Sequence, residues 1–400
     1  MSHYVCINKV KTPVFIIQAA KIQKTCHIQR FFAKKYAFYI FYFTILSISI
    51  VFYYFCKGMK KRVVFIMNPI SGAANKAEIP ELIAKTLDLE CFDYEIVMTE
   101  YPGHATEIAR QERDNGTDMV VAIGGDGTVN EVGRALVHSQ TALGIIPCGS
   151  GNGLARHLLL PLNTKKAIEI INAYEIHDLD YGIINGHPFF CTCGMGFDAF
   201  ISHKFAEAGK RGPITYVENV LREGLKYKPE VYEIQDENGT TRHRAFLISC
   251  ANASQYGNNA YIAPKASMSD GLMDVIIMEP FDVLDAPQIS IDMFNKTLDK
   301  SSKIKTFKCK KLHIKRSKPG VIHYDGDPVM AGKHVDVELK EKGIRILVNP
   351  DGNKDLRKPN MIQSAAAELF NEINVVREDI TKQTRHMLAL SKILQRKLNL

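Results

Sequence analysis

Short apolar runs alternate with amphipathic stretches between residues 63 and 147, and this alternation constrains the fold more than any other feature. The apolar runs are typical of buried strands, and the stretches between them are typical of helices. The predicted strands are Val63–Met67, Tyr94–Met98, Met119–Ile123 and Leu143–Pro147, and the predicted helices are 79–87, 105–113 and 128–138. Short units that alternate in this way predict a parallel sheet with right-handed crossovers.

The pattern changes after Asp178, where short strands follow one another with few helices between them. The predicted strands are 189–192, 231–234, 246–249, 275–278 and 312–315, with turns at 237–240 and 319–320. Helix and loop are predicted for 199–228, and a last hairpin for 335–339 and 344–348. This part of the chain therefore predicts an antiparallel β domain.

Polar and glycine-rich segments follow each of the four predicted parallel strands. They are Asn68–Gly72, Thr99 with Pro102–Ala105, Gly124–Glu131, and Pro147–Gly153. Ligands of open parallel sheets bind at the carboxyl ends of the strands, where glycine lets backbone come close and helix N-termini favour phosphate. Asp126 within one of these turns could hold Mg²⁺ with the phosphates. A tight turn alone explains any one of these loops, but four aligned loops favour a phosphate site.

Several other classes of protein are excluded by motifs that the sequence lacks. It contains no Gly-x-x-x-x-Gly-Lys-[Ser/Thr], no complete Gly-x-Gly-x-x-Gly and no protein-kinase His-Arg-Asp or Asp-Phe-Gly set. The nine cysteines form no Cys-x-x-Cys pair, which argues against a disulfide framework and a zinc site. We therefore expect free thiols in a reducing compartment.

Five motifs in this order resemble the lipid kinases with a diacylglycerol kinase catalytic domain. This family includes bacterial diacylglycerol kinases, sphingosine kinases and ceramide kinases. The motifs are Asn68–Gly72, Gly124–Thr128 with Asn130–Glu131, Gly149–Asn152, Asp270–Asp274 and Asp325–Asp327. The resemblance covers about residues 60 to 350, and it is the ordered set rather than Gly-Gly-Asp-Gly alone that makes it specific.

The resemblance implies an α/β N-terminal domain with an NAD-kinase-like parallel sheet, followed by an antiparallel β-sandwich domain. A lipid would bind in the cleft between them. The implied boundaries are 59–178 for the nucleotide-binding domain, 179–332 for the lipid-substrate domain, and 333–350 for a segment that returns to the first domain. The implied reaction is the Mg²⁺-dependent transfer of the γ-phosphate of ATP to a lipid hydroxyl, such as that of diacylglycerol or a sphingoid lipid.

The resemblance also implies roles for individual residues. The ATP-site positions are Asn68, Thr99, Gly125, Asp126, Gly127, Thr128, Asn130, Glu131 and Ser150. A magnesium site would be formed by Ser267, Asp270 and Leu272, partly through backbone carbonyls. Asp327 falls where the family places its general base, and Asp126 lies at the heart of the nucleotide and metal site.

This sequence departs from the family pattern at some of these positions. The family commonly has Glu where this chain has Asp327, so the carboxylate reaches one methylene less far, and Asp325 competes for the role of base. Residue 269 is Ser where an acidic residue is frequent, and Asn152–Arg156 is closer to the sphingosine-kinase style. These differences bear on substrate choice and metal affinity rather than on the reaction class.

The formal net charge of +8 comes from the two ends of the chain. Residues 1–62 hold 11 basic and no acidic residues, and residues 353–400 hold nine basic and five acidic ones. Residues 63–352 hold 31 basic against 38 acidic residues, so the body is mildly acidic. We therefore expect no nucleic-acid partner.

The basic leader, residues 1–58, contains an uncharged stretch at 36–56 with ten Phe or Tyr residues, clustered towards its ends. As a helix it would be about 32 Å long, enough to span a bilayer core. The protein would then act at the cytoplasmic face of a membrane, as a single-pass or peripheral protein. Alternatively translation starts at Met59, directly before the first predicted strand, and the protein is cytoplasmic. Both interpretations remain open.

The C-terminal segment 361–400 carries apolar residues in alternating steps of four and three, from Ile362 to Leu394, with one polar interruption at Gln383. This heptad pattern predicts either a coiled coil that makes a homo-oligomer or an amphipathic helix packed on the body or a membrane. Two other functions are alternatives to a lipid kinase: an NAD-kinase-like soluble small-molecule kinase and a non-catalytic membrane scaffold. The intact set of Asp126, Asp270 and Asp327 argues against a scaffold.

Overall fold

The computed structural model describes residues 60–69, 76–208, 227–282 and 285–351. The predicted leader and its apolar stretch 36–56, the loop at 70–72 and the heptad segment 361–400 lie outside these ranges. Within the described ranges, no helix has both the length and the apolar character needed to cross a membrane.

The first half of the described chain forms the parallel strands expected from its apolar runs. The strands are β1 (Lys61–Met67), β2 (Phe92–Met98), β3 (Met119–Gly124) and β4 (Ala142–Pro147), in the order β2-β1-β3-β4. All three neighbouring pairs are parallel. The strands β3 and β4 are buried along their whole length, as expected for a sheet covered on both faces.

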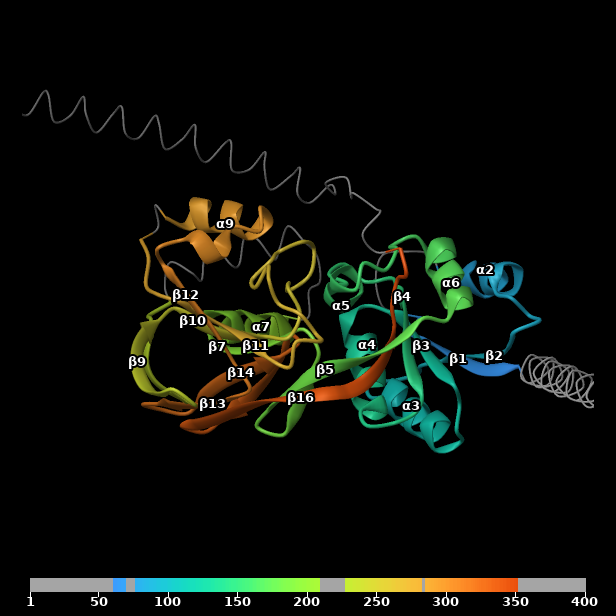
Figure 1. Ribbon diagram of the computed structural model, residues 1–400, viewed down its shortest axis with the longest axis horizontal. Helices are drawn as coiled ribbons and strands as arrows, with labels where there is room; N and C mark the ends of the chain where they lie inside the picture. Colours follow the sequence, from blue (N-terminus) through green and yellow to red (C-terminus); the bar gives the residue numbers. More distant parts are fainter. Residues whose placement is uncertain (1–59, 70–75, 209–226, 283–284, 352–400) are drawn as a thin grey trace, which may run out of the picture. The chain divides into compact units, whose positions relative to one another are not determined.

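Helices cover both faces of these parallel strands (Figure 1). They are α2 (Ile79–Thr86), α3 (His104–Asp114), α4 (Asp126–Leu136), α5 (Gly153–His157) and α6 (Thr164–Ala173). Alternate residues of each strand point to opposite faces, so β1 contributes Val64 and Ile66 to a core with α3 and α4. Val63 and Phe65 belong to a second core, with α2 and α6. Helices α5 and α6 were not predicted from the sequence.

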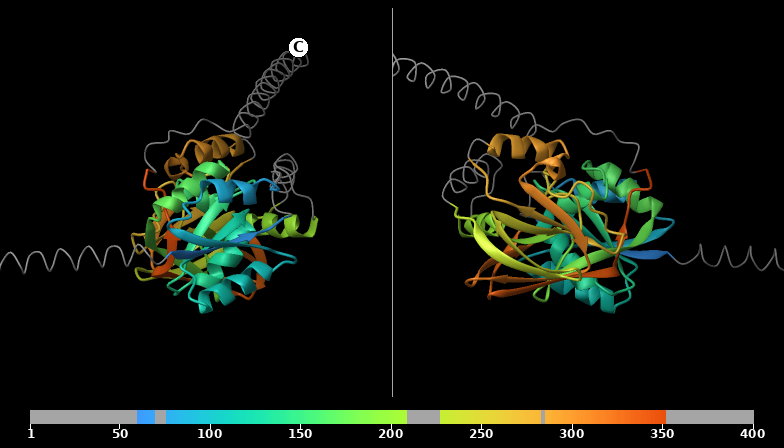
Figure 2. Two further views of the ribbon diagram at one scale, coloured as in Figure 1. Left: turned by 90° about the vertical axis from the view of Figure 1, so that its right-hand side faces the viewer. Right: turned by 60° about the vertical axis from the view of Figure 1, so that its left-hand side comes forward.

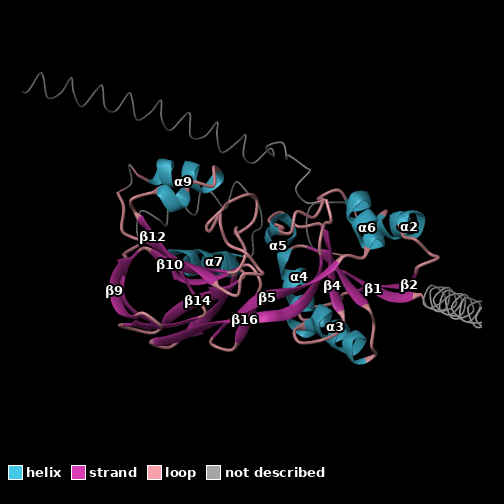
Figure 3. Cartoon of the chain, in the orientation of Figure 1, coloured by secondary structure: helices cyan, strands magenta, loops and turns pink. Residues whose placement is uncertain are grey.

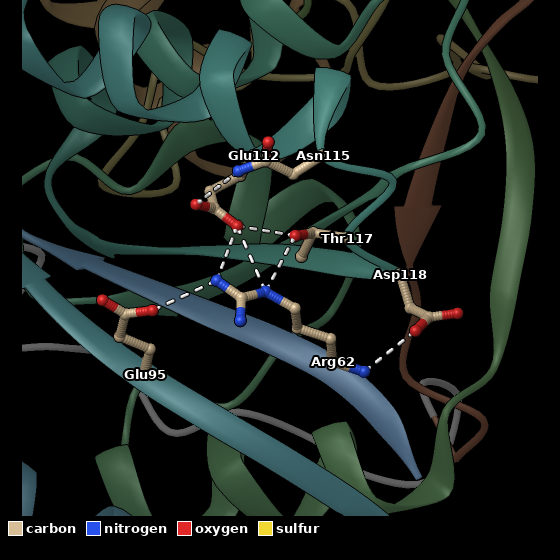
Figure 4. A network of polar contacts seen from close by, with 6 residues as sticks. All are labelled: Arg62, Glu95, Glu112, Asn115, Thr117 and Asp118. Atoms are coloured by element: carbon tan, nitrogen blue, oxygen red, sulfur yellow. Dashed lines mark hydrogen bonds and ion pairs between the residues drawn. The ribbon is translucent and has the colours of Figure 1, made fainter. Parts of the chain in front are cut away.

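A network of hydrogen bonds and ion pairs joins the amino-terminal end of β1 to α3 and β2 (Figure 4). The guanidinium of Arg62 lies 3.2 Å from Glu112 and 3.1 Å from Glu95. The Thr117 hydroxyl donates to Glu112 at 2.6 Å, and the Arg62 amide donates to Asp118 at 2.8 Å. Because Glu112 is buried, its carboxylate needs these partners. The network stabilises the end of the sheet opposite to the glycine-rich loops.

The second half is dominated by antiparallel strands (Figure 3). A six-stranded sheet has the order β12-β11-β10-β7-β14-β15, and every neighbouring pair is antiparallel. Its strands are β7 (Thr192–Gly196), β10 (Leu247–Ala251), β11 (Met273–Met278), β12 (Ile304–Cys309), β14 (Gly320–Tyr324) and β15 (Asp327–Ala331). Helices α7 (Phe197–Ala208) and α9 (Ala286–Phe294) and the 3-10 helix η1 (Leu298–Lys300) also lie in this half, and α7 and α9 contribute to the core on its outer face.

The inner face of the six-stranded sheet packs against the antiparallel part of the larger sheet. That part contains β5 (Ile176–Ile184), β6 (His187–Phe189), β8 (Glu230–Asp236), β9 (Gly239–Ala245) and β13 (Lys311–Arg316). Tyr232 and Ile314 from one side meet Met195, Ile248 and Ile277 from the other in one buried cluster. The predicted fold class, a parallel α/β sheet followed by an antiparallel sandwich, is confirmed.

The last strand, β16 (His334–Leu347), joins the two halves (Figure 2). It pairs antiparallel with β13 at its start and parallel with β4 at Ile346. The predicted hairpin of 335–339 and 344–348 is therefore wrong, because one strand runs through both segments. What resembled a turn is a register shift between Lys340 and Ile344. Lys342 has a φ of 48° there, and a Cβ on Gly343 would lie 2.4 Å from the Tyr181 ring.

Candidate functional site

The carboxyl ends of the four parallel strands lie side by side. The Thr99 amide donates to the Met67 carbonyl at 2.9 Å, which joins the ends of β2 and β1. The Asn68 amide donates to Ile123 at 3.2 Å, which joins β1 to β3. The described residues that follow the four strands therefore lie along one edge of the sheet, where ligands of such sheets bind.

Two glycines let the loops after β3 and β4 touch. A Cβ added to Gly149 would lie 2.5 Å from the Gly125 Cα, and one added to Gly125 would lie 3.2 Å from the Gly149 Cα. The Cys148 amide also donates to the Gly124 carbonyl at 2.8 Å. Side chains at the two glycines would push the loops apart, so the sequence requires glycine at this contact.

Asp126 begins α4 and ties these loops together through its carboxylate. Its two oxygens accept hydrogen bonds from the backbone amides of Asn152 at 2.8 Å and Gly153 at 2.6 Å. Burial raises the pKa of Asp126, while the bonds from the two amides and the charge of Arg156 oppose that shift. The carboxylate thus holds the β4 loop against the start of α4.

Asn152 and Arg156, which the sequence placed in the motif after the fourth strand without a role of their own, stabilise the same loop. Asn152 adopts a left-handed backbone conformation with a φ of 52°, and its amide side chain bonds both the N–H and the carbonyl of Gly149, at 2.9 and 2.7 Å. The buried guanidinium of Arg156 donates to the Gly151 carbonyl at 2.9 Å and to Asn259 at 3.2 Å. The loop therefore holds its shape through interactions on both sides.

The remaining ATP-site candidates surround this loop pair. The Asn68 side chain donates to the Thr128 hydroxyl at 3.4 Å, and Thr99, Thr128 and Asn130 are buried. Gly127 and Ser150 are exposed, and Glu131 is half-buried. The structure thus brings Asn68, Thr99, Gly125–Thr128 and the Ser150 loop to one edge of the sheet.

Lys76 is a cation at this edge that sequence reasoning missed. Its ammonium group donates to the Asn68 carbonyl, and only 6% of the residue is exposed. Burial lowers the pKa of Lys76, with the neighbouring Cys148 acting in the opposite direction. A lysine beside phosphate-binding loops would complement the charge of a polyphosphate.

Asp325 and Asp327, the two candidates for the general base, have different surroundings. The Asp325 carboxylate accepts hydrogen bonds from the backbone amides of Phe190, Cys191 and Thr192, at 2.7, 2.7 and 3.0 Å. Burial raises the pKa of Asp325 to about 6. The Asp327 side chain, in contrast, is 48% exposed. Asp325 holds the turn in shape, and Asp327 presents the accessible carboxylate.

Asp327 is paired with Arg134, a residue that the sequence did not single out. The two side chains form an ion pair with an Nη2–Oδ2 distance of 3.0 Å. The Arg134 Nε donates to the Pro188 carbonyl at 3.3 Å, and its guanidinium lies 4.6 Å from the centre of the Tyr324 ring. Because Arg134 belongs to α4, this pair links the candidate base to the helix that begins with Asp126.

The predicted magnesium residues lie in the loop before β11. Asp270 accepts hydrogen bonds from the Leu272 amide at 3.1 Å and from Lys308 Nζ at 2.6 Å. The Ser267 hydroxyl lies 3.3 Å from that of Ser269. In the part of the chain that the structure describes, no group of three or more His, Cys, Asp or Glu could hold a metal ion. The loop offers a single carboxylate and backbone carbonyls, oxygen donors that suit a hydrated Mg²⁺.

Asp180 on β5 anchors this loop and was also missed by sequence reasoning. Its carboxylate accepts from the Gly271 amide at 2.9 Å and from the Lys342 amide at 2.8 Å, and the residue is buried. The Asp180 amide donates to the Met268 carbonyl at 2.7 Å. The hydrogen bonds of the 267–272 loop thus join it to β5 and β12, and Asp180 joins β5 to β16.

His157, at the end of α5, makes the stability of this region depend on pH. Its Nδ1 accepts a hydrogen bond from the Ser254 amide at 3.1 Å, and burial lowers its pKa to about 4. Because the folded-state pKa lies below the ordinary 6.5, the neutral imidazole contributes stability above pH 6.5 that is lost as pH falls towards 4. The loss reaches about 3 kcal/mol.

We expect His157→Gln to flatten the fall of the unfolding free energy between pH 6.5 and about 4. Denaturant titrations across this range measure the effect, and His177→Gln, at an exposed histidine, is the matched control. Equal pH dependence in wild type and His157→Gln would contradict this interpretation.

Comparison with known families agrees with the arrangement of the two halves. Residues 62–184 match the diacylglycerol kinase catalytic domain, and residues 191–348 match the YegS C-terminal NAD kinase beta sandwich-like domain. The chain carries a diacylglycerol kinase catalytic domain followed by a YegS-type C-terminal domain. The two matches divide the described chain close to β6, between the parallel strands and the six-stranded sheet.

Individual proteins are similar to this chain over most of its length. It is 27% identical over 256 residues to the lipid kinase YegS of Escherichia coli, covering 62% of this chain and 84% of that protein. It is 26% identical over 307 residues to an uncharacterized protein of Synechocystis, covering 72% of this chain and 70% of that one. A diacylglycerol kinase structure from Bacillus anthracis has a TM-score of 0.57 at 20% identity, over 73% of this chain and 97% of that chain, and supports the fold.

Proposed function

We propose that this protein is an ATP-dependent lipid kinase, which transfers the γ-phosphate of ATP to a hydroxyl group of a lipid. The observation that carries the proposal is the joined pair of glycine-rich loops at the sheet edge, linked by α4 to an accessible carboxylate. Phosphoryl transfer needs little more from a protein than positioned phosphates, compensating charge and an acceptor for the hydroxyl proton.

The nucleotide would bind along the edge formed by Asn68, Thr99, Gly125–Glu131 and Ser150. The contact between Gly125 and Gly149 leaves this edge free of side chains at that point, so that backbone could approach the phosphates. The N-terminus of α4 would face the polyphosphate, and Lys76 would add positive charge. Asp126 would keep the two loops together, which is a positioning role.

Asp327 is the proposed general base. Its half-exposed carboxylate would accept the proton of the lipid hydroxyl while that oxygen bonds to the γ-phosphorus and the bond from phosphorus to the β–γ bridging oxygen breaks. ADP leaves with the electron pair of the broken bond. Asp325 is a poorer candidate, because three backbone amides already occupy its carboxylate.

Mg²⁺ is the proposed metal, and Ser267, Asp270 and Leu272 are the residues that would hold it. When bound, Mg²⁺ neutralises negative charge that develops on the phosphate oxygens. One carboxylate with backbone carbonyls agrees with the preference of Mg²⁺ for oxygen ligands and retained waters. Lys308, bonded to Asp270 at 2.6 Å, would weaken the site by competing for the same oxygen.

The acceptor would come from a membrane, so we propose that the protein works at a membrane surface. Purified protein with ATP and Mg²⁺ would be offered diacylglycerol, sphingoid bases, ceramide, phosphatidylglycerol and NAD in turn, and the phosphorylated product identified by mass spectrometry. We expect one lipid class to be phosphorylated. Phosphorylation of NAD alone would identify an NAD-kinase-like enzyme, and the absence of any product would contradict the kinase proposal.

A further inference from the structure

The carboxylate of the proposed base, Asp327, forms an ion pair with Arg134, a side chain of the nucleotide-binding half. Arg134 lies eight residues after Asp126 on α4, and Asn130 lies midway between them. Residues at i, i+4 and i+8 share one side of a helix, so one side of α4 carries all three. Side chains on a helix lean towards its N-terminus, which is the end of α4 at which Asp126 lies.

Groups other than Asp327 also hold the guanidinium of Arg134 in place. Its Nε donates to the Pro188 carbonyl of β6, and its plane lies over the Tyr324 ring of β14. Tyr324 in turn stacks with His187, at a centroid distance of 4.6 Å and an interplanar angle of 10°. Only 20% of the Arg134 side chain is exposed. A guanidinium fixed in this way loses little entropy when it orders a carboxylate.

We propose that Arg134 is a positioning residue that orients the carboxylate of Asp327 relative to the nucleotide bound at the start of α4. This inference rests on the proposed function, in which Asp327 is the base. The side chain of an aspartate has one torsion fewer than that of a glutamate, so a single bond from a fixed guanidinium is enough to set the direction of its carboxylate. The Nη2–Oδ2 bond of 3.0 Å occupies one carboxylate oxygen and leaves the other for the lipid hydroxyl.

The test is a double-mutant cycle between Arg134→Met and Asp327→Asn, with kcat and KM for ATP measured on the lipid acceptor found for wild type. If Arg134 acts through Asp327, we expect Arg134→Met to lower kcat by about 10- to 100-fold, with KM for ATP changed less than about twofold. In the Asp327→Asn background the same change should lower the residual rate less than about twofold.

Two further variants separate positioning from general loss of structure. Arg134→Lys keeps the charge without the planar fork, and we expect it to recover part of the lost rate. Arg345→Met removes another arginine that forms an ion pair, 3.6 Å from Asp178, and should leave kcat unchanged. The thermal midpoint of each variant reports whether it folds.

Each outcome bears on one of the two proposals. An inactive wild type would overturn the proposed function itself. An active wild type in which Arg134→Met retains full kcat would overturn only the role of Arg134. A tenfold loss that persists in the Asp327→Asn background would also overturn it, since Arg134 would then act independently of the base.

Discussion

Asp327→Asn is expected to lower kcat for lipid phosphorylation by about 10²- to 10⁴-fold, the usual contribution of a general base. The amide is nearly the same size as the carboxylate but does not accept the proton of the lipid hydroxyl. Its oxygen can still bond Arg134, so the turn between β14 and β15 should keep its shape. KM for ATP should change less than about twofold, because the interactions with the nucleotide are preserved.

Steady-state kinetics at saturating ATP measure this effect, with two controls. Asp114→Asn makes the same chemical change at an exposed ion pair on α3 and should leave kcat unchanged. Asp327→Glu restores the longer carboxylate that is common in the family, and should retain measurable activity. Near-normal kcat in Asp327→Asn would show that another group takes the proton.

Asp126→Asn is expected to lower kcat/KM for ATP by about 10²- to 10³-fold, since hydrogen bonds to a charged group contribute about 1.5–3 kcal/mol each. The carboxylate accepts from the amides of both Asn152 and Gly153. An asparagine offers one oxygen and turns its own N–H donors towards the second amide. The loop after β4 would then separate from α4, and the phosphates would lose part of their site.

Thermal unfolding with and without ATP distinguishes this effect from a loss of the whole fold. Wild type should be stabilised by ATP, because the ligand binds the folded state. Asp126→Asn should unfold cooperatively, but the same ATP concentration should raise its thermal midpoint less than that of wild type. Asp114→Asn should show the same ATP-induced shift as wild type. The assigned role of Asp126 would be contradicted if kcat/KM and the ATP-induced shift were both unchanged.

The sequence predicted the parallel half well, because its strands are short, apolar and buried on both faces. Apolar runs such as Met119–Ile123 fix the positions of the strands, and the polar residues that follow each run indicated the edge that carries the candidate site. The loops converge because parallel strands bring their carboxyl ends together. Glycine at 125 and 149 was expected for approach to a ligand, and the structure adds the contact between the two loops.

The sequence did not predict the contacts that join distant segments. Arg134 and Asp327 are 193 positions apart, and an arginine on a helix is usually a solvated charge. Asp180 binds the amide of Gly271 in a loop 91 positions away and that of Lys342 in β16 162 positions away, which no local pattern reveals. The single strand β16 was mistaken for a hairpin because a bulge and a turn use similar residues.

The most direct test of the central proposal uses ATP labelled in the γ-phosphate, mixed with vesicles that contain the candidate lipids. After reaction with the purified protein and Mg²⁺, the label is followed into the organic phase while ADP is quantified. We predict that the label enters the organic phase as a phosphorylated lipid, in equal amount to the ADP formed, and that Asp327→Asn slows this transfer by about 10²-fold or more. Label that remains entirely in the aqueous phase, as phosphate or on a soluble acceptor, would contradict a lipid kinase.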